Sequence, residues 1–263
     1  MRLPLYQVDA FTTRALEGNP AAVCPLDRWL DDELLRKVAA ENNLSETAYF
    51  VGREGHYDLR WFTPRCEVKL CGHATMASAF VLLSILEPKL EKVHFHTRYS
   101  GTLTVARVDR LFAMDFPALL PRPCANPPAE LGRALDAESI AAVLEAGGKY
   151  IVVYGTEDAI RRTRPDFALL ERLHPFTVAI TAPGADADFV SRYFAPSYAV
   201  PEDPATGSAH CALTPYWAAR LGKADLHARQ LSERGGELWC HMAGERVVLK
   251  GGAVLTVEGS LIL

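Results

Sequence analysis

The feature that most constrains this chain is a weak internal repeat at an offset of 135 residues. When the sequence is laid over itself at that offset, Gly72 falls on Gly207 and Gly101 falls on Gly236. Self-similarity at a constant offset is the signature of a duplicated structural unit. We therefore predict that the 263 residues form two halves with the same order of elements.

Each half is expected to contain a long helix that starts at its glycine. The segments 73–86 and 208–221 are apolar around almost their whole circumference, which implies burial on most sides. A sheet curled around such a helix would supply that burial. The predicted fold class is therefore α+β, with two pseudo-symmetric lobes, each a mixed β-sheet or partial barrel around a central helix.

The middle of the chain has the composition of a connection between lobes. The segment 117–130 holds five prolines and few residues that favour strands. We place the first lobe at residues 1–120 and the second at residues 121–263. The final strand, residues 253–259, could pack on the first lobe.

Charge and hydropathy exclude several kinds of partner. The formal net charge of −4 argues against a nucleic-acid surface, because phosphate binding needs clustered, uncompensated Lys and Arg. The sequence contains no stretch approaching the roughly 18 apolar residues of a membrane span, and its six cysteines fit a reducing compartment. We expect a cytoplasmic protein, without nucleic-acid or membrane contacts, whose partner is a small molecule.

The two glycines are the best candidates for an anion-binding site. A helix start offers unpaired backbone N–H groups and the positive end of a dipole, and glycine lets a ligand approach the backbone closely. If a pseudo-twofold axis relates the halves, Gly72 and Gly207 can face each other across a cleft. They would then hold a carboxylate or a developing enolate without metal or cofactor.

Polar side chains flank both glycines. His73 and Ser208 occupy matching positions just after them, and Asp203 lies shortly upstream of the second. An imidazole, a carboxylate and a hydroxyl suit proton transfer to, and hydrogen bonding of, a polar ligand. Structural roles are equally open at this point, since Thr206 and Ser208 suit helix N-caps and Asp203 suits a turn.

Glu46 lies where a helix from about residue 31 gives way to a strand near Thr47. Asn42 and Asn43 end that helix and suit a left-handed C-cap. The spacing alone does not separate a catalytic glutamate from an exposed surface glutamate, the more usual case.

Five colinear motifs across nearly the whole chain resemble the phenazine-biosynthesis isomerase-like (PhzF-like) family. They are VDAFTTRALEGNPAAV, AENNLSETAYF, RWFTPRCEVKLCGHATMASA, EDPATGSAHCALTPYW and RQLSERGG. Such a set is far more specific than one glycine pattern. The resemblance implies the diaminopimelate epimerase-like fold and a homodimer.

The resemblance also implies roles for individual residues. In family members of known activity, the glutamate of the S-E-T motif moves a proton while dihydro-hydroxyanthranilate is isomerised, and Glu46 matches it. His73, Asp203 and Ser208 match groups that bind and polarise the substrate. The expected pocket lining consists of Asn19, Cys71, Gly72, Thr206 and Gly207. The implied enzyme is a cofactor-independent isomerase of a small carboxylate-bearing substrate.

Two other functions are kept as alternatives. A thiol-dependent racemase or epimerase needs a cysteine on each loop, but the position that matches Cys71 is Thr206, and the next cysteine is Cys211 on the helix. That pair is incomplete. A non-catalytic binding or interaction protein would also fit, because a fold does not fix an activity.

Metal and nucleotide sites have little support in the sequence. Cys66, Cys71 and His73 do not form a four-ligand set with zinc-like spacing, and His94 and His96 would project both rings from one face of a strand without completing one. The sequence lacks a G-x-G-x-x-G motif and a G-x-x-x-x-G-K-[ST] motif. We therefore expect neither a metal nor a cofactor.

Overall fold

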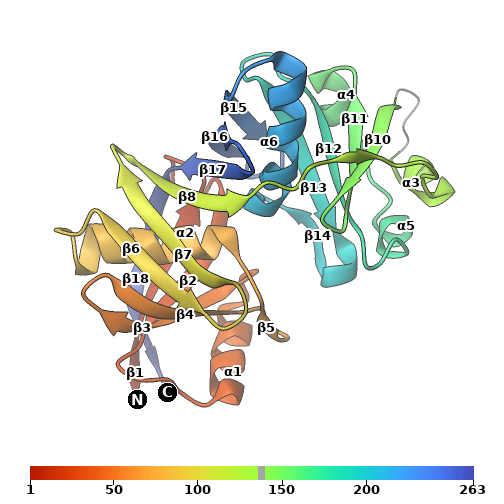
Figure 1. Cartoon of the computed structure of the whole chain (residues 1–263). Helices are drawn as coiled ribbons and strands as arrows, with labels where there is room; N and C mark the ends of the chain where they lie inside the picture. Colours follow the sequence, from red (N-terminus) through yellow and green to blue (C-terminus); the bar gives the residue numbers. More distant parts are fainter. Residues whose placement is uncertain (136–139) are drawn as a thin grey trace. The chain divides into compact units, whose positions relative to one another are not determined.

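The computed structural model describes residues 1–135 and 140–263, which form two compact units (Figure 1). The first unit comprises Met1–Asp115 and Lys250–Leu263, and the second comprises Phe116–Leu249. Both combine a strongly bent mixed sheet with a long buried helix, so the predicted α+β class is confirmed. In these described segments, no helix reaches the length and apolarity needed to span a bilayer.

The first unit contains twelve elements. They are β1 (Arg2–Ala10), β2 (Asn19–Pro25), α1 (Asp32–Asn42), β3 (Thr47–Arg53), β4 (His56–Phe62), β5 (Glu67–Val68), α2 (Gly72–Val81), the π-helical turn η1 (Leu82–Leu86), β6 (Lys92–Thr97), β7 (Gly101–Val108), β8 (Leu111–Pro117) and β18 (Ala253–Ile262). β18 runs antiparallel along the whole of β1, from Arg2 opposite Ile262 to Ala10 opposite Ala253. The end of the chain therefore completes the first unit.

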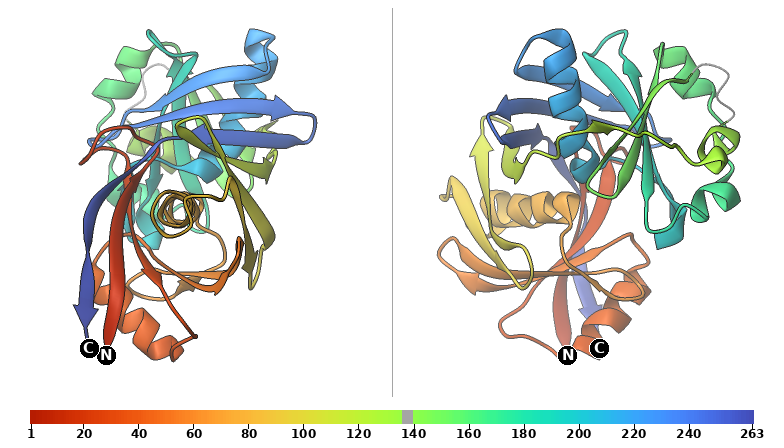
Figure 2. Two further views of the ribbon diagram at one scale, coloured as in Figure 1. Left: turned by 90° about the vertical axis from the view of Figure 1, so that its left-hand side faces the viewer. Right: turned by 45° about the vertical axis from the view of Figure 1, so that its right-hand side comes forward.

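The strands of the first unit surround α2. Figure 2 (left) looks along this helix and shows strands around it. Eight of its ten residues are buried, as the apolar circumference of the segment predicts. The buried hydroxyls of Thr75 and Ser78 donate to the carbonyls of Cys71 and Ala74, so these polar groups are satisfied within the helix.

The described residues of the second unit form fourteen elements. They are β9 (Arg122–Pro123), α3 (Ala129–Ala134), β10 (Ile140–Ala146), β11 (Lys149–Tyr154), α4 (Glu157–Arg162), α5 (Phe167–Glu171), β12 (Thr177–Pro183), β13 (Phe189–Ala195), the 3-10 turn η2 (Pro196–Tyr198), β14 (Val200–Asp203), α6 (Gly207–Leu221), β15 (Asp225–Gln230), β16 (Gly236–Ala243) and β17 (Arg246–Gly251).

Strand pairing in the two units follows one scheme. β1, β2, β3, β4, β6 and β7 pair successively as antiparallel, parallel, antiparallel, parallel and antiparallel neighbours. β10, β11, β12, β13, β15 and β16 pair in the same order of directions. The duplication indicated by the 135-residue offset is therefore present in the topology.

The helix α6 contains a proline, and a contact from outside the helix compensates for it. Pro215 has no N–H, so the carbonyl of Cys211 loses its usual helical donor. The N–H of Leu119 donates to that carbonyl at 2.9 Å. Leu119 lies in the proline-rich segment that the sequence indicated as a connection. This bond anchors that segment to α6.

Candidate active site

Glu46 lies in the short bend between α1 and β3, and both sides of that bend are fixed. α1 ends at Asn43, which adopts the left-handed conformation (φ 50°, ψ 34°) and donates its N–H to the carbonyl of Ala39, as the C-cap prediction required. The carbonyl of Glu46 accepts a hydrogen bond of 3.2 Å from Ala22 on β2. The backbone therefore holds Glu46 in place.

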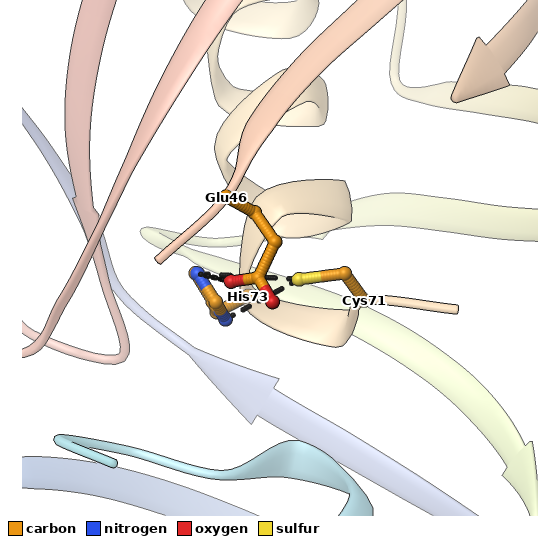
Figure 3. Close-up of side chains that lie close together, drawn as sticks. All are labelled: Glu46, Cys71 and His73. Atoms are coloured by element: carbon orange, nitrogen blue, oxygen red, sulfur yellow. Dashed lines mark hydrogen bonds and ion pairs between the residues drawn. The ribbon is translucent and has the colours of Figure 1, made fainter. Parts of the chain in front are cut away.

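The Glu46 side chain meets Cys71 and His73 at the start of α2 (Figure 3). Glu46 Oε2 lies 3.3 Å from His73 Nε2, an ion-pair distance without hydrogen-bond alignment. Cys71 Sγ lies 3.4 Å from His73 Nδ1, and Ser45 Oγ lies 3.4 Å from His73 Nε2. The structure thus brings together three side chains that the sequence placed in two separate segments.

Burial sets the protonation behaviour of Glu46, whose side chain is 16 % exposed. Desolvation raises its pKa above the ordinary value, because burial penalises the ionised carboxylate. Hydrogen bonds from Ser45 and Cys71 act in the opposite direction and are weaker in effect. A raised pKa makes the ionised carboxylate a stronger base than that of an exposed surface glutamate.

The start of α2 lies beside Glu46, close to Cys71 and His73. α2 begins at Gly72, as predicted, and Cys71 is its extended N-cap residue without a side-chain capping bond. The first N–H groups of a helix have no partner within the helix, and the helix dipole is positive at this end. Negative charge is therefore stabilised close to Glu46 and His73.

Asn19 is fully buried at the start of β2 and is held there by its neighbour in the G-N-P motif. Gly18 has a φ of +68°, and a Cβ at this position would lie 2.3 Å from the carbonyl oxygen of Ala10. Only glycine fits such a turn. Since β2 runs parallel to β3, Asn19 lies on the strand next to the one that follows Glu46.

In the second unit, the N–H, the hydroxyl and the carbonyl of Thr206 all contact side chains of other residues. Its N–H donates to Gln230 Oε1 (2.9 Å), and its hydroxyl donates to Asp203 Oδ2 (2.5 Å) and accepts from Gln230 Nε2 (3.1 Å). His210 Nδ1 lies 2.8 Å from the Thr206 carbonyl. Thr206 is the N-cap residue of α6, but its hydroxyl makes no capping bond, so the simple N-cap role is wrong for that side chain.

Gly207 and Ser208 open α6. Gly207 is the first residue of the helix and is buried, whereas Ser208 is exposed on the first turn. Burial raises the pKa of Tyr193 to about 12, and a hydrogen bond with Ser208 contributes a smaller opposing effect. Ser208 therefore has a hydroxyl that is accessible and lies beside a neutral phenol.

Two residues near this loop have roles that the sequence reasoning missed. Gln230 is 1 % exposed and also donates to the carbonyl of Asp203 at 2.6 Å, so it clamps the loop that precedes α6. His210 is fully buried beneath the same loop. Gln230 stands in the RQLSERGG motif, but its contact with Thr206 joins residues 24 positions apart, which no local pattern reveals.

The possible metal ligands differ from those considered in the sequence. The sequence analysis weighed Cys66 as a ligand beside Cys71 and His73. In the structure, Cys66 is exposed and contacts Thr63. Within the described chain, the donor atoms of Glu46, Cys71 and His73 all lie within 4.8 Å of one another. This set supplies three ligands, one fewer than a structural zinc site uses.

A comparison with protein families decides where the chain belongs. The family model described as "Phenazine biosynthesis-like protein" matches residues 8–259. The chain belongs to this family. The assignment covers every motif on which the resemblance rested, and with it the reaction class of an isomerase is confirmed.

Relatives and solved structures agree with membership in the phenazine biosynthesis-like family. An uncharacterized isomerase of Pseudomonas aeruginosa is 53% identical over 263 residues, with 100% of both chains covered. The crystal structure of a PhzF-family phenazine biosynthesis protein from Enterococcus faecalis matches with a TM-score of 0.95 and 42% identity, again over 100% of both chains. A predicted epimerase from Pseudomonas aeruginosa matches at 22% identity with a TM-score of 0.75 over 99% of both chains, which shows a shared fold.

Proposed function

We propose that this isomerase works without a cofactor and moves a proton on a small carboxylate-bearing substrate, with Glu46 as both acid and base. The observation that carries the proposal is the environment of Glu46, a largely buried carboxyl group with a raised pKa, 3.3 Å from His73. Proton abstraction from carbon needs a base whose pKa lies near the working pH. Burial raises the pKa of Glu46 in that direction.

The start of α2 and His73 would hold the negative charge of the substrate. As a proton leaves carbon, charge develops on the neighbouring carboxylate or enolate, and fixed backbone dipoles stabilise it without reorganising. His73 lies next to this helix start and within reach of Glu46. In this proposal, it polarises the substrate and keeps Glu46 oriented.

In the second unit, Asp203 and Ser208 would bind polar groups of a small ligand at the start of α6, beside Thr206 and Gly207. Support comes from the rigidity of the loop, since Asp203 is fixed through Thr206 and Gln230. A fixed carboxylate can orient an amino or hydroxyl group of a ligand at little entropic cost on binding. The exposed hydroxyl of Ser208 can donate or accept as needed.

The substitution Glu46→Gln tests this function. We expect it to preserve ligand binding and to lower turnover by about 10²- to 10⁴-fold, the usual contribution of a general acid–base. Turnover is measured by proton NMR as exchange of carbon-bound hydrogen with deuterium from solvent, on carboxylates that the wild-type chain converts, beginning with dihydro-hydroxyanthranilate. Glu41→Gln, an exposed position on α1, is the matched control. Undiminished exchange in Glu46→Gln would remove Glu46 from its role.

A thiol-dependent epimerase is the second candidate, because Cys71 contacts both His73 and Glu46. If the thiol carried the proton, Cys71→Ala would abolish exchange as completely as Glu46→Gln does. In the carboxyl mechanism, Cys71→Ala retains most of the exchange, since it removes only one hydrogen bond to Glu46. Comparison of the two variants therefore assigns the proton carrier.

A further inference from the structure

The outer face of β4 and β6 in the first unit carries a compact array of imidazoles. His56 on β4 pairs in register with His94 on β6, and two residues further along Asp58 pairs with His96. Residues two apart on a strand point to the same face, so these four side chains form a two-by-two array. The residues between them, such as Tyr57, are buried on the opposite face.

The spacing of the rings matches what a shared metal ion requires. The ring centre of His56 lies 5.1 Å from that of His94 and 6.0 Å from that of His96. Two imidazoles that share a tetrahedral ion have ring centres about 5 Å apart, because each metal–nitrogen bond is about 2 Å long. The ring of His56 lies nearly parallel to those of His94 and His96, at 22° and 12°, so metal binding would require His56 to rotate about its side-chain bonds.

The neighbouring strand orients two of these rings. On β7, the hydroxyl of Thr104 lies 2.9 Å from His94 Nδ1, and that of Thr102 lies 3.0 Å from His96 Nδ1. Metal-binding histidines commonly use one ring nitrogen for such a bond and the other for the ion. A threonine hydroxyl can accept from Nδ1–H, which leaves the lone pair of Nε2 for a metal.

The charges around the array permit a cation. Arg60 and Arg98 both form ion pairs with the two carboxylates of Glu67 and Asp32, so the two guanidinium charges are offset. Asp58 adds a carboxylate within the array.

We propose that His56, His94 and His96 bind one divalent late first-row transition-metal ion, such as Ni²⁺, Cu²⁺ or Zn²⁺, through Nε2, with Asp58 and water completing the coordination. Imidazole ligands suit these ions, whereas Mg²⁺ and Ca²⁺ prefer oxygen. This surface site is separate from Glu46 and does not depend on the proposed isomerase mechanism.

Calorimetric titration of the full chain with Ni²⁺ tests the proposal. We expect one site in the wild type, about tenfold weaker binding in His56→Ala, and at least about a hundredfold loss in the double variant His94→Ala/His96→Ala. His241→Ala is the matched control, because His241 is also exposed on a strand but is bonded to Asp225 in the other unit. It should bind Ni²⁺ as the wild type does.

Two further variants separate this site from the Glu46–Cys71–His73 group and from general loss of structure. Thr104→Val removes only the hydroxyl and should weaken binding by about tenfold, with an unchanged circular dichroism spectrum. Cys71→Ser should leave Ni²⁺ affinity unaltered. The proposal is overturned if the wild type shows no binding tighter than millimolar, or if binding is lost in Cys71→Ser and kept in the histidine double variant.

Discussion

The loops that precede α2 and α6 occupy equivalent places in the two units, yet their side chains do different work. In the first loop, at the start of α2, Cys71 and His73 contact each other and also Glu46, which lies between α1 and β3. In the second, Thr206 and Asp203 are fixed by Gln230, and their polar atoms are largely used within the loop. The two units therefore share the same backbone arrangement here. The first carries a group of reactive side chains, and the second carries a rigid, hydrogen-bonded loop.

One interaction survives in both loops with different residues. The N-cap carbonyl of α2 accepts from the hydroxyl of Thr75 at 2.6 Å, and the N-cap carbonyl of α6 is bonded to Nδ1 of His210 at 2.8 Å. Thr75 and His210 are related by the same 135-residue offset as the glycines. The two bonds are equivalent, but only the one in the second unit is made by a side chain that titrates, the imidazole of His210.

The largest predicted effect therefore concerns acid stability of the second unit. Burial lowers the pKa of His210 to about 4, from 6.5 in the unfolded chain. The unfolded chain binds the proton first, so the stabilisation is complete above pH 6.5 and is lost as pH falls towards 4, by about 3 kcal/mol. His210→Thr copies the first unit and should remove this loss, as measured by urea unfolding between pH 7 and pH 4. An unchanged pH dependence would contradict the comparison.

A smaller effect on stability is expected from Gln230, which holds the loop that precedes α6. Gln230→Leu leaves the buried N–H of Thr206 without its acceptor and should lower the free energy of unfolding by about 2 kcal/mol. Because Asp203 loses its anchor, ligand binding should weaken as well. Gln7→Leu, at a half-buried glutamine of β1, should change stability by less than about 0.5 kcal/mol. Equal effects of the two substitutions would show that Gln230 is not a clamp.

The smallest predicted effect is the change with pH in the free energy of unfolding that Glu46 of the first unit causes. The folded-state pKa of Glu46 is raised above 4.5, so its contribution to stability is present below pH 4.5 and is lost as pH rises through the folded pKa. Glu46→Gln should therefore become more stable than the wild type with rising pH, by about 1.4 kcal/mol for each unit of pKa elevation. Urea unfolding at pH 4 and pH 8 measures this, with Glu41→Gln as the control. Identical differences at both pH values would mean that Glu46 ionises as a surface carboxyl.

The sequence predicted the fold well where the local signals were strong. The starts of α2 at Gly72 and α6 at Gly207 were predicted from the repeat, and the coinciding glycines Gly101 and Gly236 prove to begin β7 and β16. Helix lengths were less predictable. α1 has eleven residues, but its counterpart α5 has only five, and Pro175, which has no N–H to continue a helix, follows four residues after its end.

The site was only partly accessible from the sequence. Glu46 and His73 were named through the resemblance, but nothing in their spacing showed that they approach to 3.3 Å. Gln230 and His210 were missed because a buried polar residue is identified by its partner, and the partner lies elsewhere in the chain. The His94–His96 pair was visible on one strand, whereas His56 joined it only through strand pairing.

The amino-acid order alone determined the duplicated topology, the positions of the glycines at the helix starts and the family, because each depends on periodicity or on contiguous motifs. Tertiary structure decided the burial of Glu46, the clamping of Thr206 and the clustering of His56 with His94 and His96. These properties depend on solvent exclusion and on distances between residues far apart in the chain, and both exist only once the strands have paired.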